Sequence, residues 1–343
     1  MQKLGFAIVG AGFIGQVHAE VLSGIEQAEL KAVYNRSPER GRALANRFQI
    51  EWYDDFEKLL ARDDIDVINI CTPSSLHRDF AIPAAKAGKH LIVEKPLDVT
   101  VEKCDQIIEA AAENSVTLSV IYQNRFKDAV QAMREALDEN RCGKLVLGDA
   151  QIKWYRPEEY FQGWKGTKKY DGGGALMNQG SHTIDLLQWM MGDVEVVFGN
   201  VATLVHKIEV EDVGVATLQF KSGALGIIEG STAIYPGLDE RLGVYGEDGT
   251  IEIEGNRIVT WRFRKEKEDD EKKRLIGKGK RGGGASKPTG ISLENHRRQL
   301  QEIINSIFKG RKPMVDGEEA RKSIAIIEAI YKSKRTGRPV ILS

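Results

Sequence analysis

The sequence has little cysteine, no excess of charge of either sign and no long hydrophobic run. Its three cysteines, Cys71, Cys104 and Cys142, include no closely spaced pair, which argues against a disulfide framework or a thiolate zinc site and predicts a reducing, cytoplasmic compartment. The 49 Lys and Arg residues nearly balance the 50 Asp and Glu residues, whereas proteins that bind nucleic acid or anionic membranes usually carry a positive excess. No stretch approaches the roughly 18 continuous apolar residues that a membrane span requires.

Length and composition are those of an ordinary folded protein. With 343 residues, 41% of them hydrophobic and 29% charged, the chain is long enough for two domains or one large one. Its beginning contains a lysine and apolar residues, as a signal peptide does, but Gly10, Gly12 and Gly15 interrupt the apolar run and no cleavage site is evident. We therefore expect a complete, soluble chain without a targeting segment.

The first third of the sequence alternates short runs rich in Val and Ile with helical patterns. The runs lack polar alternation, as strands buried on both faces do. Repeated strand-helix-strand units of this length predict an α/β domain with a doubly wound parallel sheet. The predicted strands are Leu4–Val9, Leu30–Tyr34, Val67–Cys71, Leu91–Val93 and Thr117–Ile121.

After about residue 124 the pattern changes to a helical stretch at Ala129–Leu137, followed by longer segments in which polar and apolar residues alternate. Such alternation predicts strands with one buried face, and the turn sequences between them indicate hairpins. We expect a second, α+β domain over residues 124–343 with a mostly antiparallel sheet. The predicted strands are Leu145–Trp154, Val213–Phe220, Ala224–Ser231, Leu242–Tyr245 and Thr250–Ile253.

A charged, glycine-rich segment interrupts the second domain at residues 262–290. It carries 11 Lys and Arg against 5 Asp and Glu and has few apolar residues, so we expect a mobile surface loop. A contact with an acidic neighbouring subunit or an anionic substrate is the alternative. Helical periodicity returns at Leu293–Phe308 and at Glu318–Lys334.

A glycine motif, Gly10-Ala11-Gly12-Phe13-Ile14-Gly15, lies between the first predicted strand and the first helix. In this spacing the first glycine permits a tight turn, the second lets the backbone approach a pyrophosphate, and the third allows close packing of helix on strand. The helix N-terminus then supplies N–H donors to the phosphates. The motif predicts a dinucleotide-binding Rossmann domain over residues 1–123, with Gly10, Gly12, Phe13, Ile14 and Gly15 at the cofactor.

The residue that meets the adenosine ribose is expected about 20 positions beyond the motif, at Asn35. An acidic residue there would indicate NAD. Asn35 can bind a ribose hydroxyl without repelling a phosphate, and Arg36 and Ser37 can hold a 2′-phosphate. The three residues therefore slightly favour NADP over NAD, the alternative being that Arg36 is only a solvated loop charge.

Glu94-Lys95-Pro96 follows the strand predicted at Leu91–Val93, at the carboxyl edge of the sheet where open α/β sheets bind ligands. A turn that aims the lysine into the crevice would make the Lys95–Pro96 bond cis. A buried ammonium can orient a substrate hydroxyl and stabilise a developing alkoxide. The alternative is an exposed loop lysine.

A second candidate segment runs from Asp171 through Gly172-Gly173-Gly174 to Asp185. On a helix, Asn178, His182 and Asp185 share one face, and Met177 and Ile184 point away from it. A histidine on a polar face can act as general acid and base near neutral pH, with Asn178 or Asp185 to orient it. A surface or capping histidine is the alternative.

Together these motifs resemble those of the Gfo/Idh/MocA oxidoreductases, and the resemblance covers nearly the whole chain. It is carried by Gly10–His18, by Cys71-Thr72-Pro73 with His77, by Glu94-Lys95-Pro96 and by Gly172 through His182. It implies an N-terminal Rossmann domain and a C-terminal α/β domain whose open sheet commonly forms a dimer or tetramer interface. It also implies a catalytic Lys–Asp–His set, matched here by Lys95, position 178 and His182. Because position 178 is asparagine, proton acceptance would fall more heavily on His182 or Lys95.

The resemblance implies further site residues. It places Cys71, Thr72, Pro73, His77 and Glu94 beside the nicotinamide half of the cofactor. It places Tyr122, Asn124 and Arg125 at the crossing into the substrate domain, Trp164 with Lys165 near the cofactor, and Tyr155 and Arg156 at the substrate. Each of these can instead be an ordinary surface residue.

The sequence therefore predicts an NAD(P)-dependent dehydrogenase or reductase that acts on a secondary hydroxyl or ketone of a sugar, sugar derivative or cyclic polyol. His182 would remove the hydroxyl proton, Lys95 would stabilise the alkoxide and Asn178 would hold the hydroxyl, with Asp185 orienting the imidazole. Arg125, Arg156 and Lys153 can meet a carboxylate, a phosphate or a nucleotide-linked sugar. One alternative is a glycosidase that oxidises its substrate transiently and then eliminates. Another is a non-catalytic dinucleotide sensor. We expect a homodimer or homotetramer, and neither nucleic acid nor membrane as a partner.

Overall fold

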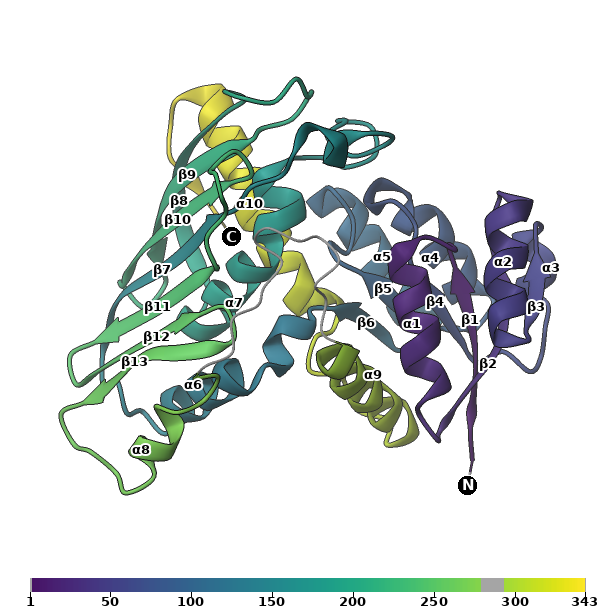
Figure 1. The fold of residues 1–343 in the computed structure, drawn as a ribbon, viewed down its shortest axis with the longest axis horizontal. Coiled ribbons are helices and arrows are strands. Elements are labelled where there is room, and N and C mark those ends of the chain that lie inside the picture. The colour runs from purple at the N-terminus through teal and green to yellow at the C-terminus, as the bar shows by residue number, and fades with distance from the viewer. Residues whose placement is uncertain (1, 279–292, 343) are drawn as a thin grey trace. The chain divides into compact units, whose positions relative to one another are not determined.

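The computed structural model describes residues 2–278 and 293–342, which fall into two compact units (Figure 1). The first unit contains residues 1–123 and 292–321, and the second contains residues 124–291 and 322–343. The chain passes from the first unit to the second after residue 123. The segment that follows residue 291 was expected in the second domain, but its helix α9 (Leu293–Phe308) packs on the first unit, because Leu300, Ile303 and Ile304 join the core of that unit.

The first unit is built on a parallel sheet in the order β3-β2-β1-β4-β5-β6, counted over the described residues. This is the strand order of a dinucleotide-binding Rossmann fold, so the predicted doubly wound sheet is confirmed. The strands are β1 (Leu4–Val9), β2 (Ala28–Tyr34), β3 (Glu51–Tyr53), β4 (Val67–Ile70), β5 (His90–Glu94) and β6 (Leu118–Ile121). The sequence analysis missed β3, because it is three residues long and only partly buried.

Helices connect these strands, and polar side chains cap several of them. Ser37 caps α2 (Pro38–Phe48), whose first residue is a proline, and Thr100 caps α5 (Val101–Glu113) by accepting from the N–H of Lys103. The other helices are α1 (Phe13–Ser23), α3 (Phe56–Leu60) and α4 (His77–Lys86), with a 3-10 turn η1 (Ser74–Leu76) before α4. These caps satisfy N–H groups at the helix starts, which follow the carboxyl ends of the parallel strands.

The described part of the second unit contains a sheet in the order β13-β12-β11-β7-β10-β9-β8-β14. Strands β7 and β10 pair in parallel and the other neighbours pair antiparallel, as predicted. The strands are β7 (Leu145–Lys153), β8 (Val194–Ala202), β9 (Val213–Phe220), β10 (Leu225–Ser231), β11 (Arg241–Gly246), β12 (Gly249–Glu254), β13 (Arg257–Phe263) and β14 (Val340–Ile341). Helix α7 (Ser181–Met191) packs on β7 and β11 and thus covers one face of this sheet (Figure 1).

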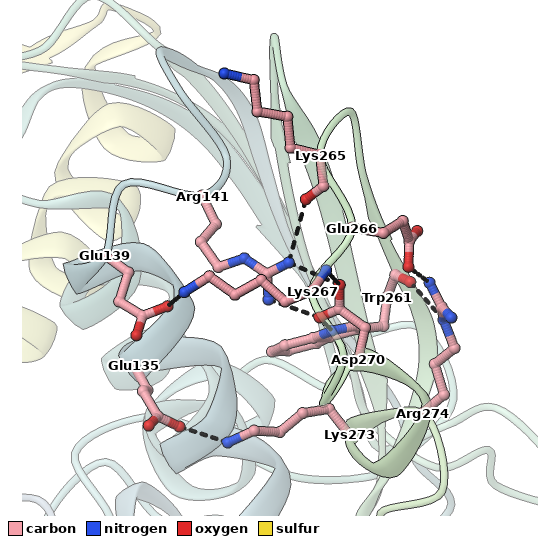
Figure 2. A network of polar contacts seen from close by, with 10 residues as sticks. All are labelled: Glu135, Glu139, Arg141, Trp261, Lys265, Glu266, Lys267, Asp270, Lys273 and Arg274. Carbon is pink, nitrogen blue, oxygen red and sulfur yellow. Dashed lines mark hydrogen bonds and ion pairs between the residues drawn. The ribbon is translucent and has the colours of Figure 1, made fainter.

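The charged segment is folded as far as residue 278, so the predicted mobile loop is wrong for residues 262–278. Its first residues complete β13, and α8 (Asp270–Lys273) follows. Asp270 is buried and accepts hydrogen bonds from Arg141 (2.6 and 2.8 Å) and from the indole of Trp261 (2.7 Å), as Figure 2 shows. Several charges of the run are thus paired with one another or with neighbouring residues, although most of these side chains remain exposed at the surface. Residues 279–290 lie outside the described residues.

Two of these pairs reach across to α6 (Asp128–Asp138) and the residue that follows it. Lys267 pairs with Glu139 (2.7 Å), and Lys273 pairs with Glu135 (Figure 2).

Among the residues that the structure describes, no helix is long and apolar enough to cross a membrane.

Candidate active site

The glycine motif forms the turn between β1 and α1 with the geometry that its spacing predicts. Gly10 has a φ of +110°, and a Cβ on Gly15 would lie 2.0 Å from the carbonyl oxygen of Gly10. A Cβ on Gly12 would meet no atom within 4 Å, so the backbone there borders open space. No side chain caps α1, and its first turn holds no acidic residue. The helix N-terminus is therefore ready to receive an anionic pyrophosphate, and the residues fit a dinucleotide.

Asn35 connects this turn to the end of β2. Its Oδ1 accepts from the N–H of Ala11 (3.0 Å), and its Nδ2 donates to the carbonyl of Ser37 (2.9 Å). The predicted ribose ligand thus also braces the glycine turn, while Arg36 beside it is exposed. The predicted contacts with the ribose and its phosphate stay predictions.

A hollow of about 370 Å³ opens beside the glycine turn. Gly12 and Phe13 line one side of it, and Arg40 and Arg47 of α2 line another. The two arginines are not among the site residues predicted from the sequence. The pattern that could have identified them is their spacing of seven residues, which places both side chains on one side of a helix. That helix begins at the predicted phosphate contact.

A buried hydrogen-bond network lies directly beneath Lys95. His18 contacts Glu94 Oε1 through Nε2 (2.9 Å) and Asn69 Nδ2 through Nδ1 (2.8 Å). The other carboxylate oxygen, Glu94 Oε2, accepts from the backbone N–H of Lys95 (3.0 Å). Lys95 itself is half-buried between buried neighbours, and the Lys95–Pro96 bond is cis, as predicted.

The charge of Glu94 is stabilised within this network. Burial alone would raise the pKa of Glu94, but the hydrogen bond with His18 and the charges of His18, His296 and Lys95 together lower it below its ordinary value. By contrast, burial raises the pKa of the Cys71 thiol, which keeps it protonated near neutral pH. An ionised Glu94 can therefore hold the backbone of Lys95 over a wide pH range.

His296 on α9 completes this cluster, with its ring centroid 5.5 Å from that of His18. His18, Glu94 and His296 are all buried, and their ligand-type atoms lie within 4.8 Å of one another, so by residue type they could hold a metal ion. Both ring nitrogens of His18 already contact Asn69 and Glu94. We therefore interpret the cluster as a hydrogen-bond network that supports Lys95.

His77 joins the loops that follow β4 and β5. Its ring is buried, and its nitrogens lie 2.9 Å from the carbonyl oxygen of Pro96 and 3.1 Å from that of Thr72. Thr72 and Pro73 are half-buried at the carboxyl end of β4. The structure thus brings together the first-unit residues that were predicted around the nicotinamide, although their contacts with the cofactor stay predictions.

In the second unit, Asn178 and His182 stand out by their exposure. All the remaining residues from Gly173 to Gln188 are buried, whereas Asn178 and His182 are half-buried. Asn178 lies on a π-helix, η4 (Ala175–Gly180), that runs directly into α7 with His182. The sequence analysis expected a regular α-helix here, and the π-helix is a feature often found at functional sites. The chain thus presents an amide and an imidazole, four residues apart, from an otherwise buried helix.

Glu211 and Tyr331 hold the backbone that leads into this helix. The Glu211 carboxylate accepts from the N–H groups of Gly174 (2.9 Å) and Leu176 (3.0 Å) and from the Tyr331 hydroxyl (2.8 Å). A Cβ at Gly174 would lie 1.8 Å from the carbonyl oxygen of Glu211, and one at Gly173 would lie 2.2 Å from the Tyr331 hydroxyl, so both positions require glycine. Burial raises the pKa of Glu211 even though these hydrogen bonds lower it. The sequence analysis missed both residues.

Asp171 is a further carboxylate beside Asn178. It is buried, accepts from Asn178 Nδ2 (2.7 Å) through Oδ1 and accepts from the N–H of Gly166 (2.8 Å) through Oδ2. The sequence analysis included it in the motif but gave it no role.

Arg156 and Lys165 bring two positive charges to one aromatic ring. Arg156 is buried, with its guanidinium 4.7 Å from the ring of Trp154 and 5.3 Å from that of Tyr160. The ammonium of Lys165 lies 3.7 Å from the same Tyr160 ring. Burial lowers the pKa of both side chains, and Asp171 partly opposes this for Lys165. Two partly desolvated cations on a ring form a site suited to an anionic group.

Other predicted site residues have structural partners. Arg125 is buried and donates two hydrogen bonds to Asp185 (2.8 and 2.7 Å), with Trp189 stacked on its guanidinium at 4.8 Å. Lys153 pairs with Glu229 (2.7 Å). The ring of Tyr155 packs on that of Tyr235, Tyr122 is buried, and Asn124 and Trp164 are half-buried. Roles for these residues at cofactor or substrate, and for Asp185 in orienting His182, stay predictions.

Comparison with known protein families agrees with this architecture. Residues 4–122 match the domain described as "Oxidoreductase family, NAD-binding Rossmann fold", and residues 130–252 match the "GFO/IDH/MocA C-terminal domain". The chain therefore belongs to the Gfo/Idh/MocA oxidoreductase family, as the motifs predicted. The matched N-terminal domain is that of a family of oxidoreductases with an NAD-binding Rossmann fold.

Several known proteins are similar over most of the chain. Myo-inositol 2-dehydrogenase of Thermotoga maritima is 28% identical over 98% of this chain and 97% of its own. The uncharacterized oxidoreductase YrbE of Bacillus subtilis is 30% identical over 74% of each. Among solved structures, the WlbA dehydrogenase from Bordetella pertussis in complex with NADH and UDP-GlcNAcA is 33% identical, with a TM-score of 0.91, covering 100% of this chain and 98% of that one.

Proposed function

We propose that the protein oxidises a secondary hydroxyl of a nucleotide-linked sugar acid, with NAD(P) as hydride acceptor. The observation that carries this proposal is the pair Asn178 and His182, the partly exposed residues of a buried helix that a dedicated set of hydrogen bonds holds in place. An amide and an imidazole that remain partly accessible within a buried segment are available to bind a substrate.

In the proposed reaction each group has one task. The bound dinucleotide supplies a nicotinamide C4 that receives the hydride. His182 accepts the hydroxyl proton, and Lys95, whose backbone Glu94 holds, stabilises the alkoxide as the proton leaves. Asn178 holds the substrate in place, since an amide can bind a hydroxyl but cannot take up its proton.

The substrate class rests on two supports. The solved relative with 33% identity holds UDP-GlcNAcA, a nucleotide-linked sugar acid. In this chain Arg156 and Lys165 form a partly desolvated cationic site around Tyr160 that a carboxylate would neutralise. We expect Arg156→Gln and Lys165→Gln to raise KM for UDP-GlcNAcA more than KM for its uncharged counterpart UDP-GlcNAc.

For the cofactor, we propose a slight preference for NADP. Arg36 is exposed next to Asn35, Ser37 caps α2, and Arg40 lines the hollow at the glycine turn. These groups can meet a 2′-phosphate, and no acidic side chain occupies the position that would repel one.

We also propose that the protein is a homodimer or homotetramer formed through the exposed face of the second sheet. Four apolar side chains there are 39 to 57% exposed on neighbouring strands, namely Phe198, Val215, Leu225 and Ile227. An apolar patch of this kind is typical of an interface. Light scattering after size exclusion should show an oligomer that Phe198→Glu with Leu225→Glu converts to monomer, whereas a monomeric wild type would refute the proposal.

The proposed function is tested with a panel of UDP-GlcNAcA, UDP-GlcNAc, UDP-glucose, free sugars and myo-inositol, each with NAD and NADP. We expect reduced nicotinamide to form with UDP-GlcNAcA. Release of an aglycone without net reduced nicotinamide would indicate the glycosidase. Tight dinucleotide binding without turnover of any substrate would favour the sensor.

A further inference from the structure

We propose that Asp171 is a positioning residue that turns the amide of Asn178 so that its oxygen, and not its NH2 group, faces the substrate. Asn178 would then accept a hydrogen bond from a hydroxyl or amide N–H on a carbon next to the one that is oxidised. This proposal rests on the proposed function, because it assigns Asn178 a place at the substrate.

The two ends of an asparagine amide have opposite hydrogen-bonding character: the NH2 group only donates and the oxygen only accepts. An ionised carboxylate only accepts. The 2.7 Å contact between Asp171 Oδ1 and Asn178 therefore requires the NH2 group on that side. Because the amide is planar, its oxygen points to the opposite side, away from Asp171.

Asp171 is itself held in one orientation. Its second carboxylate oxygen accepts from the N–H of Gly166 (2.8 Å), and its own N–H donates to the carbonyl of Thr167 (3.0 Å). The side chain is buried, so water does not compete for these bonds. Before Asn178 in the chain, the Glu211 carboxylate accepts from the N–H groups of Gly174 and Leu176. Two buried carboxylates thus hold the short segment that carries Asn178.

The orientation of the Asn178 amide would determine which substrates are turned over well. His182 lies four residues beyond Asn178, at the start of α7, and is likewise half-buried. We place the two side chains at neighbouring groups of one sugar ring. If His182 takes the proton of the reacting hydroxyl, the oxygen of Asn178 faces an adjacent ring position. A donor at that position is then bound, and a sugar that lacks one is turned over less well.

An exchange of the two side chains tests the proposal, because it keeps the hydrogen bond between them and the one from the N–H of Gly166. In the double variant Asp171→Asn with Asn178→Asp, the new amide donates to the new carboxylate and accepts from Gly166, and an acceptor oxygen still faces the substrate. Each single variant should lose about 10- to 100-fold in kcat, with a smaller change in KM. The double variant should recover to within about threefold of wild type.

Wild type, the two single variants and the double variant are also compared by thermal unfolding. The Tm values report the stabilising effect of the contact between positions 171 and 178 independently of turnover. Coupling between positions 171 and 178 in both Tm and kcat supports the proposal. Coupling in Tm alone shows a purely structural pair and overturns it, as does the absence of coupling in both. If wild type turns over no substrate of the panel, the proposed function fails and this proposal falls with it, whereas turnover by wild type without coupling in kcat overturns this proposal alone.

Two further variants complete the design. If Asn178→Asp does not fold, Asn178→Ala replaces it: in that background Asp171→Asn should no longer change kcat, and a further loss would overturn the proposal. Asp270→Asn is the matched control, because it also removes a buried carboxylate of the second unit. It should lower Tm and leave kcat unchanged.

Discussion

The carboxylate of Glu94 accepts a hydrogen bond from the backbone N–H of the next residue, Lys95, at 3.0 Å. The same carboxylate contacts the buried ring of His18, which contacts Asn69 in turn. Lys95 is thus presented from a backbone that is fixed on its buried side. An arrangement of this kind suits a lysine with a defined target, because a lysine in solvent requires no such support.

The first prediction concerns Lys95. Lys95→Ala should reduce turnover below detection and leave the dissociation constant of the dinucleotide within about threefold of wild type, because the glycine turn lies elsewhere in the first unit. Steady-state kinetics and fluorescence titration with NADH check this. Lys86→Ala, an exposed lysine of α4, is the control and should behave as wild type. Retained turnover in Lys95→Ala would refute the assignment.

The second prediction concerns His182. His182→Ala should lower kcat by about 100- to 10,000-fold, which is the usual contribution of general acid and base catalysis. It should also flatten the dependence of kcat on pH, since no imidazole remains to take up the proton. A variant whose pH profile matches that of wild type would dismiss His182 as the base.

A third prediction concerns the support of the π-helix. Glu211→Ala should lower the free energy of unfolding by about 1–3 kcal/mol for each buried donor left without a partner, and the N–H groups of Gly174 and Leu176 both lose theirs. It should also lower kcat more than it changes KM. Glu209→Ala, an exposed neighbour, is the control for urea unfolding and kinetics. Equal stability of the two variants would contradict the proposed support.

The folded charge run predicts a response to acid. Hydrogen bonds from Arg141 hold the pKa of Asp270 well below its usual range in spite of burial. A carboxylate with a lowered pKa stabilises the fold above the pKa of the unfolded chain, about 3.9, and this stabilisation is lost as pH falls further. Asp270→Asn should therefore be less stable than wild type by about 3–5 kcal/mol at pH 7.

The difference in the free energy of unfolding between Asp270→Asn and wild type should shrink as pH falls below about 4. Trp261 donates to Asp270, so its fluorescence during denaturant unfolding reports this region directly. A difference that stays constant down to the lowest accessible pH would show that the ionised carboxylate is not the source of the stabilisation.

A fifth prediction separates the two dinucleotides. Arg40→Ala and Arg36→Ala should weaken NADPH binding by about tenfold and leave NADH binding nearly unchanged, because NADPH carries the extra phosphate. Titration of both cofactors checks this. A wild type that binds NADH much more tightly than NADPH would refute the proposed phosphate contact.

The sequence was sufficient for what local pattern determines. The runs that became β1, β4 and β5 are buried and rich in Val and Ile, and the spacing of Gly10, Gly12 and Gly15 has few other physical explanations. The sequence placed Asn178, His182 and Asp185 on one polar face, but only the first two are half-buried, whereas Asp185 is buried and pairs with Arg125. The π-helix itself was not visible in the sequence.

What the sequence did not reveal depends on contacts between distant residues. Tyr331 lies 120 positions from Glu211, and α9 packs on helix α1, nearly 300 residues earlier. The charged run appeared too polar to fold, because composition does not show that Asp270 finds Arg141 and Trp261 as partners. Asp171 escaped attention because only its contact with Asn178 gives it a role.

The central claim is that Lys95 and His182 carry out an NAD(P)-linked oxidation of a nucleotide-linked sugar acid. The most direct measurement is the reduced-nicotinamide absorbance formed when UDP-GlcNAcA is added to the wild type, to Lys95→Ala and to His182→Ala, each saturated with NAD or NADP. We predict reduced nicotinamide with the wild type and none above background with either variant. Equal formation in all three proteins, or none in the wild type at any substrate concentration, would contradict the account.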